Sequence, residues 1–212
     1  MDPRKIVPAK LTMSEVRDIA ERFRSEYIFN DSIPVDIERI IESTMGICII
    51  PVKSLQHDCD MEGFISRDFK SIYLDEDLYM DDRYYKRVRF TIAHEIGHLV
   101  LHRSNIDLVR FLSDDDWKGF RLNLLDEPLR WFEIQASEFA GRLLVPIDHL
   151  IEAFKEARLE IIRKNSSWDA PKMDDEELLS IIASGIASKF GVSSEVIERR
   201  LRKENVMSLI GK

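Results

Sequence analysis

The segment "RVRFTIAHEIGHLVLHR", residues 87–103, decides how the rest of the sequence is interpreted. Apolar residues cover most of the circumference of the helix that it predicts, but His94, Glu95 and His98 interrupt them. Burying an imidazole or a carboxylate without a partner is costly, so these three side chains need one.

The spacing of these polar residues indicates a metal site. His94 and His98 are four residues apart, so they lie on one helix face about one turn apart and can bind one ion through nitrogens about 2.0–2.1 Å from it. Glu95 lies about 100° further around the axis, where it can accept a proton from water. Gly97 costs about 1 kcal/mol inside a helix and suits a close approach by another backbone. Because the His-Glu-x-x-His pattern also arises by chance, a third ligand would strengthen this interpretation.

The segment "EIQASEFAGRLLVP", residues 133–146, offers two candidates for that ligand, Glu133 and Glu138. Glu133 is favoured because the small residues Ala136 and Ser137 follow it on the same face and permit close packing. Ser137 could accept a hydrogen bond from a ligand imidazole. Glu138 points away from Glu133 and is expected to be a peripheral charge.

The remaining histidines fit the metal site less well. His102 would lie about 12 Å along the helix from His94, so we expect it near the helix C-terminus, where the helix dipole favours it. His57 and His149 stand in unrelated segments and are expected to be structural or exposed. The segment "QHDCDMEG", residues 56–63, has one cysteine and no Cys-x-x-Cys partner for it, and we interpret it as a loop rather than another metal site.

The fold class predicted from these patterns is α+β with helices dominant. A capping box formed by Thr12 and Glu15 predicts a helix over residues 13–27. "GFIS" and "SIYL" flank the turn-like "RDFK", and together with "ICIIPV" they predict a small antiparallel sheet. Pro146 should end the helix that carries Glu133.

A polar segment, "NSSWDAPKMDD", predicts a linker between a domain at 1–164 and a helical segment at 165–212 that packs on it. The C-terminal "SIIASGIASKFGVSSEVIERRLRK" resembles a helix-turn-helix. DNA binding normally requires a basic surface, whereas this chain has a net charge of -8. We therefore expect no direct nucleic-acid binding and favour packing or docking of a partner, with a DNA-binding regulator kept as an alternative.

The composition predicts a soluble, cytoplasmic protein. Apolar runs are shorter than the roughly 20 residues of a membrane span, and the N-terminus lacks the apolar region of a signal peptide. Two cysteines, Cys48 and Cys59, are too few for a disulfide framework.

Together, "RFTIAHEIGHLVLH" and "EIQASEFAGRLLVP" closely resemble the ImmA/IrrE family of zinc metallopeptidases, and the likeness spans most of residues 30–205. The resemblance implies a mostly helical, zincin-like domain in which His94, His98 and Glu133 bind Zn2+ and Glu95 is catalytic. One residue departs from the family pattern, because Ser137 stands where the family usually has Asn or Asp.

The same resemblance implies an endopeptidase that cleaves a helix-turn-helix transcriptional repressor, in a mobile element or a stress response, and so relieves repression. The alternative is a zinc-containing module that inactivates its repressor by docking without efficient cleavage. We expect the strand at 71–74 to present an edge to an extended substrate. Residues 104–130 either cover the cleft or only pack on it. The candidates for stabilising the oxyanion are Tyr73, Tyr84, Tyr85 and His102.

Overall fold

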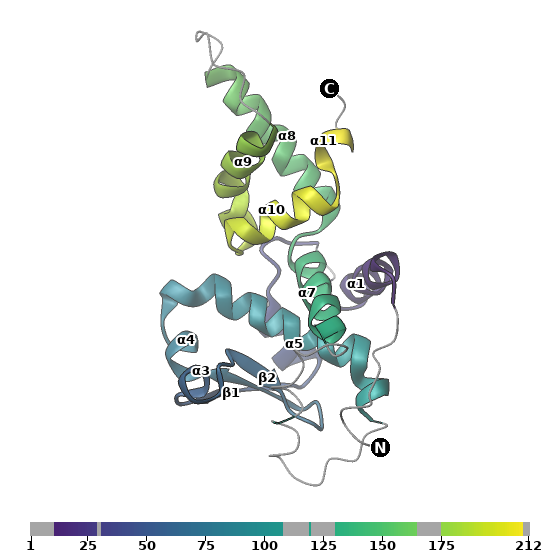
Figure 1. The fold of residues 1–212 in the computed structure, drawn as a ribbon, viewed down its shortest axis with the longest axis vertical. Coiled ribbons are helices and arrows are strands. Elements are labelled where there is room, and N and C mark those ends of the chain that lie inside the picture. The colour runs from purple at the N-terminus through teal and green to yellow at the C-terminus, as the bar shows by residue number, and fades with distance from the viewer. Residues whose placement is uncertain (1–10, 29–30, 108–118, 120–129, 165–174, 210–212) are drawn as a thin grey trace. The chain divides into compact units, whose positions relative to one another are not determined.

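The computed structural model describes residues 11–28, 31–107, 119, 130–164 and 175–209. It confirms the expectation of a mostly helical protein with a small sheet (Figure 1). In chain order the elements are α1 (Met13–Tyr27), α2 (Ile37–Arg39), a π-helical turn (Ile40–Thr44), β1 (Cys48–Val52), α3 (Leu55–Cys59), β2 (Gly63–Ile65), β3 (Ser71–Asp75), α4 (Glu76–Tyr79), a 3-10 turn (Asp82–Tyr84), α5 (Tyr85–Ile106), α7 (Arg130–Leu144), α8 (Ile147–Lys164), α9 (Asp175–Phe190), α10 (Ser194–Lys203) and α11 (Val206–Leu209).

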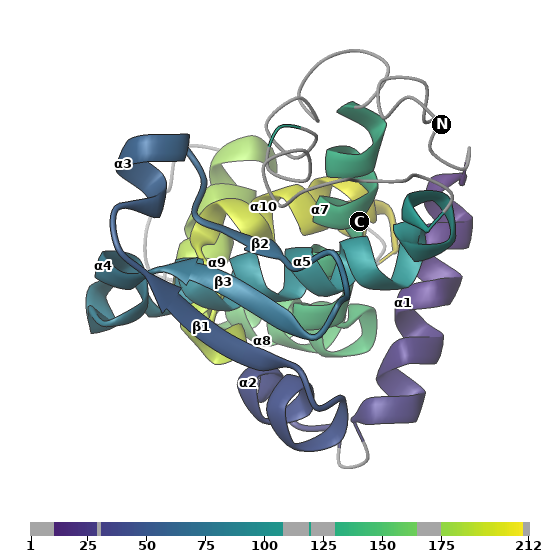
Figure 2. The ribbon, with the colours of Figure 1, turned by 90° about the horizontal axis from the view of Figure 1, so that it is seen from below.

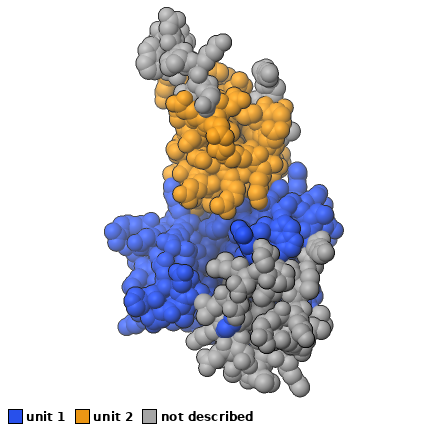
Figure 3. Space-filling model, in the orientation of Figure 1, with its two compact units in different colours: residues 1–32, 36–143 blue, residues 33–35, 144–212 orange. Residues whose placement is uncertain are grey.

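The chain forms two compact units, coloured separately in Figure 3. Unit 1 comprises residues 1–32 and 36–143, and unit 2 comprises residues 33–35 and 144–212. The expected linker falls almost entirely outside the described residues, so the domain division at residue 164 stays a prediction. Within the described part of the chain, no helix is both long enough and apolar enough to cross a membrane.

Helix α1 begins and ends where the sequence predicts. The Thr12 side chain accepts a hydrogen bond from the Glu15 backbone, and the Glu15 carboxylate accepts one from the Thr12 N–H at 2.7 Å, which completes the capping box. The buried face of α1 carries Phe23, whose ring meets that of Phe139 in α7 edge-on at 5.6 Å. The N-terminal helix is thereby packed against the helix expected to carry the third ligand.

The sheet is mixed, so the prediction of a purely antiparallel sheet is wrong in part. Strands β2 and β3 form the expected antiparallel hairpin, with Phe64 opposite Tyr73, but β1 pairs with β3 in parallel. The strand order is therefore β1-β3-β2. The physical reason is the length of the connection between β1 and β2, which includes α3. It allows β2 to lie one strand position away from β1, so that β3 fits between them and pairs with β1 in parallel.

Because β3 is the central strand, residues 71–74 present no free edge, and the expectation that they would align a substrate is wrong. Strand β2 lies at the edge of the sheet and packs against α5 (Figure 2). The hairpin turn is held by Ser66, whose hydroxyl accepts hydrogen bonds from the backbone of Lys70 and Ser71 at 3.2 and 3.0 Å. The sheet thus holds β2 beside the helix that carries the metal-binding motif.

Helix α5 follows a 3-10 turn whose first N–H groups are capped by Asp81, while α5 itself begins after Tyr84 without a side-chain cap. It continues to Ile106, so the expectation that His102 lies at its C-terminus is wrong. Ile92 and Ile96 are fully buried, which anchors the middle of the helix in the core. This anchoring gives the motif histidines a rigid support.

In unit 2, α9 and α10 are joined by a short turn in which Gly191 adopts a φ of 64°, and the side chain of Ser193 caps α10 by accepting a hydrogen bond from the Val196 N–H. The Arg200 side chain, only 3% exposed, forms an ion pair with Glu204 at 2.6 Å and donates to the Val145 carbonyl at 3.4 Å. At least one of the basic residues near the C-terminus therefore serves the packing of this unit.

Candidate metal centre

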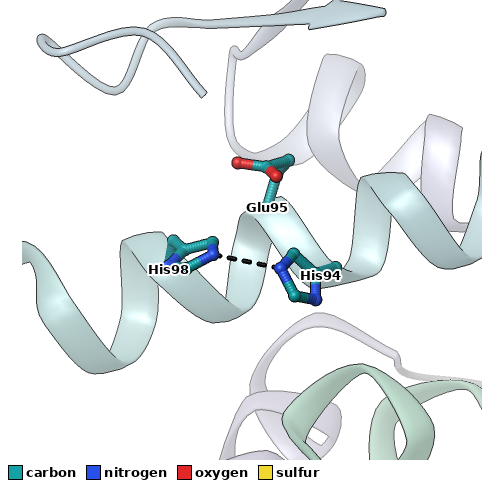
Figure 4. A group of neighbouring side chains, drawn as sticks. All are labelled: His94, Glu95 and His98. Atoms are coloured by element: carbon teal, nitrogen blue, oxygen red, sulfur yellow. Dashed lines mark hydrogen bonds between the residues drawn. The ribbon is translucent and has the colours of Figure 1, made fainter. Parts of the chain in front are cut away.

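The two motif histidines face each other from successive turns of α5. The Nε2 atoms of His94 and His98 lie 3.1 Å apart, and Figure 4 shows the two rings turned toward one another. His98 is buried, with 1% of its side chain exposed, while His94 is 15% exposed. The site is thus closed on the His98 side and more open at His94.

Helix α7 brings Glu133 to the same point. One carboxylate oxygen of Glu133 lies 2.9 Å from Nε2 of His94, and the other lies 3.2 Å from Nε2 of His98. Glu133 was the favoured third ligand in the sequence, and the structure places it beside both imidazoles. The side chain is 25% exposed, so this carboxylate also borders the open side of the site.

The contact between α5 and α7 depends on two small residues. A Cβ atom added to Gly97 would lie 3.0 Å from both the Cα and the carbonyl oxygen of Ala136. That distance is shorter than an ordinary contact of about 3.5–4.0 Å between carbon atoms. Gly97 therefore permits an approach that a larger residue would obstruct, and Ala136 lies three residues after Glu133.

The donor set fits a metal ion. A tetrahedral ion with bonds of about 2.1 Å holds its ligand atoms roughly 3.4 Å apart. The separations of 2.9, 3.1 and 3.2 Å among the two imidazole nitrogens and the carboxylate oxygens lie within a few tenths of an ångström of that value. Two imidazoles and one carboxylate are also the donor set of many catalytic zinc sites, in which a fourth position stays open.

The charge of the site is consistent with this fit. Burial acts to raise the pKa of the Glu133 carboxyl, but the positive charge of His98 and hydrogen bonds from both imidazoles act more strongly in the opposite direction. The pKa of Glu133 therefore lies well below its usual range, and the side chain is a carboxylate. An ionised carboxylate is the form that binds a metal ion.

Glu95 lies beside these ligands and is held by the sheet. Its carboxylate and the His94 and His98 nitrogens lie within 4.8 Å of one another. The side chain is almost fully buried, and its Oε2 accepts a hydrogen bond from the backbone N–H of Ile65 in β2 at 2.8 Å. Strand β2 thus orients the residue expected to act as the catalytic base.

The partners of the remaining imidazole nitrogens come from α5 and α7. The Ser137 hydroxyl lies 3.3 Å from Nδ1 of His94, and His102 lies 3.1 Å from Nδ1 of His98. His102 in turn lies 3.0 Å from Oε1 of Gln135, a residue that the sequence analysis did not single out. Its signal was its position two residues after Glu133 on the same helix.

Glu138 is not the peripheral charge that we expected. It is 4% exposed and accepts a hydrogen bond from Arg142 at 2.6 Å, one turn further along α7. The expectation failed because an arginine four residues later can neutralise a glutamate inside the protein.

Other candidate residues lie away from the site or stay unassigned. His57 is exposed on α3, where its Nδ1 bonds to Asp58 at 2.7 Å, and His149 lies on α8 in unit 2. Tyr84 and Tyr85 lie where α5 begins, at least about 13 Å along the axis from His94. Most of the segment 104–130, expected to cover the cleft or pack on it, falls outside the described residues, which include only 104–107, 119 and 130 of it.

A His-Glu-x-x-His helix with a carboxylate brought beside it by a second helix defines the class of metal-dependent peptidases. The Peptidase_M78 family model, described as the IrrE N-terminal-like domain, matches residues 43–202, a range that contains both helices. The chain therefore belongs to this family, that of the ImmA/IrrE metallopeptidases. No curated protein is similar enough to this chain to count as a match.

Proposed function

We propose that the protein is a zinc endopeptidase in which His94, His98 and Glu133 bind the zinc ion and Glu95 is the catalytic base. The observation that carries this proposal is the convergence of two imidazole nitrogens and a carboxylate within 3.2 Å of one another. Zinc, when bound, would supply the Lewis acidity that makes water a nucleophile near neutral pH.

The other steps belong to the protein's own residues. Glu95 takes a proton from the attacking water and passes it to the amine that leaves when the peptide bond breaks. The Ile65 N–H holds one oxygen of Glu95, which keeps the carboxylate in a fixed orientation for both proton transfers. The exposed sides of His94 and Glu133 mark the direction from which a polypeptide can approach.

We further propose that the substrate is a protein, namely a helix-turn-helix transcriptional repressor, whose cleavage relieves repression. The resemblance to the ImmA/IrrE family motivates this choice of substrate. In unit 2, Arg202 pairs with Glu176 at 2.7 Å and Arg200 with Glu204. These two belong to the basic side chains of α10 that could contact DNA, namely Arg199, Arg200, Arg202 and Lys203, and both already have acidic partners. These pairings favour a function that acts on protein rather than on DNA.

A comparison of the native chain with Glu95→Gln tests the proposal, because glutamine can still accept the hydrogen bond from Ile65 but cannot take a proton. Both proteins are expressed in cells of the source organism, and new protein N-termini are identified by mass spectrometry. We expect cleavage of a repressor by the native protein alone, with equal zinc content in both proteins. Equal cleavage by the variant would contradict the role of Glu95. Relief of repression by both proteins without cleavage would identify a docking module instead.

A further inference from the structure

A chain of buried polar side chains runs from His98 away from the metal-binding face. Nδ1 of His98 lies 3.1 Å from Nδ1 of His102, and Nε2 of His102 lies 3.0 Å from Oε1 of Gln135. The Gln135 amide nitrogen then donates to the backbone carbonyl of Leu11 at 3.5 Å. His98 is 1% exposed, and His102 and Gln135 are both fully buried.

The far end of this chain determines where the protons lie. A backbone carbonyl only accepts hydrogen bonds, so the Leu11 contact fixes which end of the Gln135 amide is the nitrogen. The Gln135 oxygen then faces His102 and requires an N–H at Nε2 of that ring. A neutral His102 accepts at Nδ1, so His98 must carry a proton on Nδ1, which leaves Nε2 as the nitrogen that can bind a metal ion.

The two ligand imidazoles differ in this respect. Nδ1 of His94 faces the hydroxyl of Ser137, which can either donate or accept, so this contact does not select a tautomer. His94 is also partly exposed, and water can replace the serine. For His98 the partner at Nδ1 is the imidazole of His102 rather than a hydroxyl, and only 1% of the His98 side chain is exposed to solvent. Its tautomer is therefore restricted by its partner.

We propose that His102 and Gln135 are positioning residues for the metal site: they hold His98 in the tautomer and orientation in which Nε2 faces His94 and Glu133. This inference rests on the metal site of the proposed function. In this proposal His102 supports the metal ligand His98, whereas the sequence predicted either a residue near the helix C-terminus or a candidate for stabilising the oxyanion. The partner of a metal-binding imidazole typically contributes about 10–100-fold to metal affinity.

Two substitutions at His102 separate positioning from packing. His102→Phe keeps a ring of similar shape against Phe132, which the native ring meets edge-on at 4.5 Å, but removes the acceptor. His102→Asn returns an oxygen close to the position of Nδ1. Zinc affinity, measured by competition with a chelator, should fall by about 10–100-fold in His102→Phe and recover most of that loss in His102→Asn.

Two further variants serve as controls. Ile106→Ala removes a residue that is 3% exposed one turn further along α5, and it should leave the zinc affinity nearly unchanged. Gln135→Leu should weaken binding by itself but add little to His102→Phe, because residues that act through one chain are not additive. An unchanged affinity in His102→Phe would overturn the proposal, as would an equal loss in Ile106→Ala or fully additive losses in the double variant.

A readout that needs neither zinc nor activity is the proton on Nδ1 of His98 in the zinc-free protein. Nuclear magnetic resonance of histidine labelled with nitrogen-15 should show a proton on Nδ1 of His98 in the native protein, and His102→Phe should lower the protonated fraction of this nitrogen. A native His98 without a proton on Nδ1 would overturn the proposal. If the native protein bound no zinc, or if Glu133→Ala bound it equally well, the proposed function would fail, and the proton on Nδ1 would still report on the chain of buried side chains by itself.

Discussion

Replacing Gly97 by alanine tests how closely α5 and α7 must approach. The new Cβ would lie 3.0 Å from the Cα and the carbonyl oxygen of Ala136, so the α7 backbone must move by about 0.5 Å to restore an ordinary contact. Overpacking of this kind costs about 1–3 kcal/mol. Alanine gains about 1 kcal/mol in helix propensity over glycine. The free energy of unfolding should therefore change by between about 0 and -2 kcal/mol.

Gly185 provides a matched control, because it also lies inside a helix and a Cβ there would meet nothing within 4 Å. Gly185→Ala should therefore raise the free energy of unfolding by about 0.5–1 kcal/mol. The propensity gain is common to both variants, so the difference between them isolates the overpacking cost, about 1–3 kcal/mol. Urea unfolding followed by circular dichroism, without zinc, measures both values.

The same pair of variants links packing to the metal site. Glu133 stands three residues before Ala136 on α7, so a shift of that helix displaces the carboxylate from the histidines. Gly97→Ala should bind zinc more weakly than the native protein, and Gly185→Ala should bind it equally well. If Gly97→Ala stabilised the protein as much as Gly185→Ala and kept its zinc affinity, the inferred close contact would be refuted.

Two other predictions concern stability. Glu138→Ala breaks a buried ion pair and should cost about 3–5 kcal/mol in urea unfolding. Lys164→Ala removes an exposed pair with the same four-residue spacing and should change the free energy of unfolding far less. Equal costs would contradict the role of burial. Thr12→Ala should cost about 1 kcal/mol at pH 7 through loss of the cap. The pKa of Glu15 is lowered, chiefly by the hydrogen bond from the Thr12 backbone, so the stability that this carboxylate adds is present above its ordinary pKa of 4.5 and is lost as the pH falls below it. Thr12→Ala keeps the backbone N–H that lowers this pKa most but removes the hydroxyl, which also donates to the Glu15 carboxylate, at 2.8 Å. Part of its effect should therefore be lost in acid, and an effect independent of pH would contradict this contribution of the hydroxyl.

Much of the site could be predicted because helical periodicity converts spacing in sequence into direction in space. The spacing of four residues from His94 to His98 places both rings on one face, and the small residues after Glu133 predict the close approach that Gly97 allows. The first helix could also be predicted, since a capping box is a local pattern that needs no tertiary information. These features depend on residues within one or two turns of each other.

What the sequence did not predict depends on contacts between distant segments. The parallel pairing of β1 with β3 follows from the path of the connection, which the strand sequences do not encode. The burial of Glu138 and the partner of His102 depend on which face of α7 meets the core. In both cases a signal existed, since Arg142 follows Glu138 by four residues and His102 follows His98 by four. The sequence shows these spacings, but it does not show that the side chains are buried and therefore need each other as partners.

The central claim is that α5 and α7 together bind one metal ion. A crystal structure of the protein grown with zinc tests this most directly. We expect one ion about 2.0–2.2 Å from Nε2 of His94, Nε2 of His98 and a carboxylate oxygen of Glu133. An ion bound by the two histidines with the Glu133 carboxylate more than about 4 Å away, or bound elsewhere in the chain, would contradict the account.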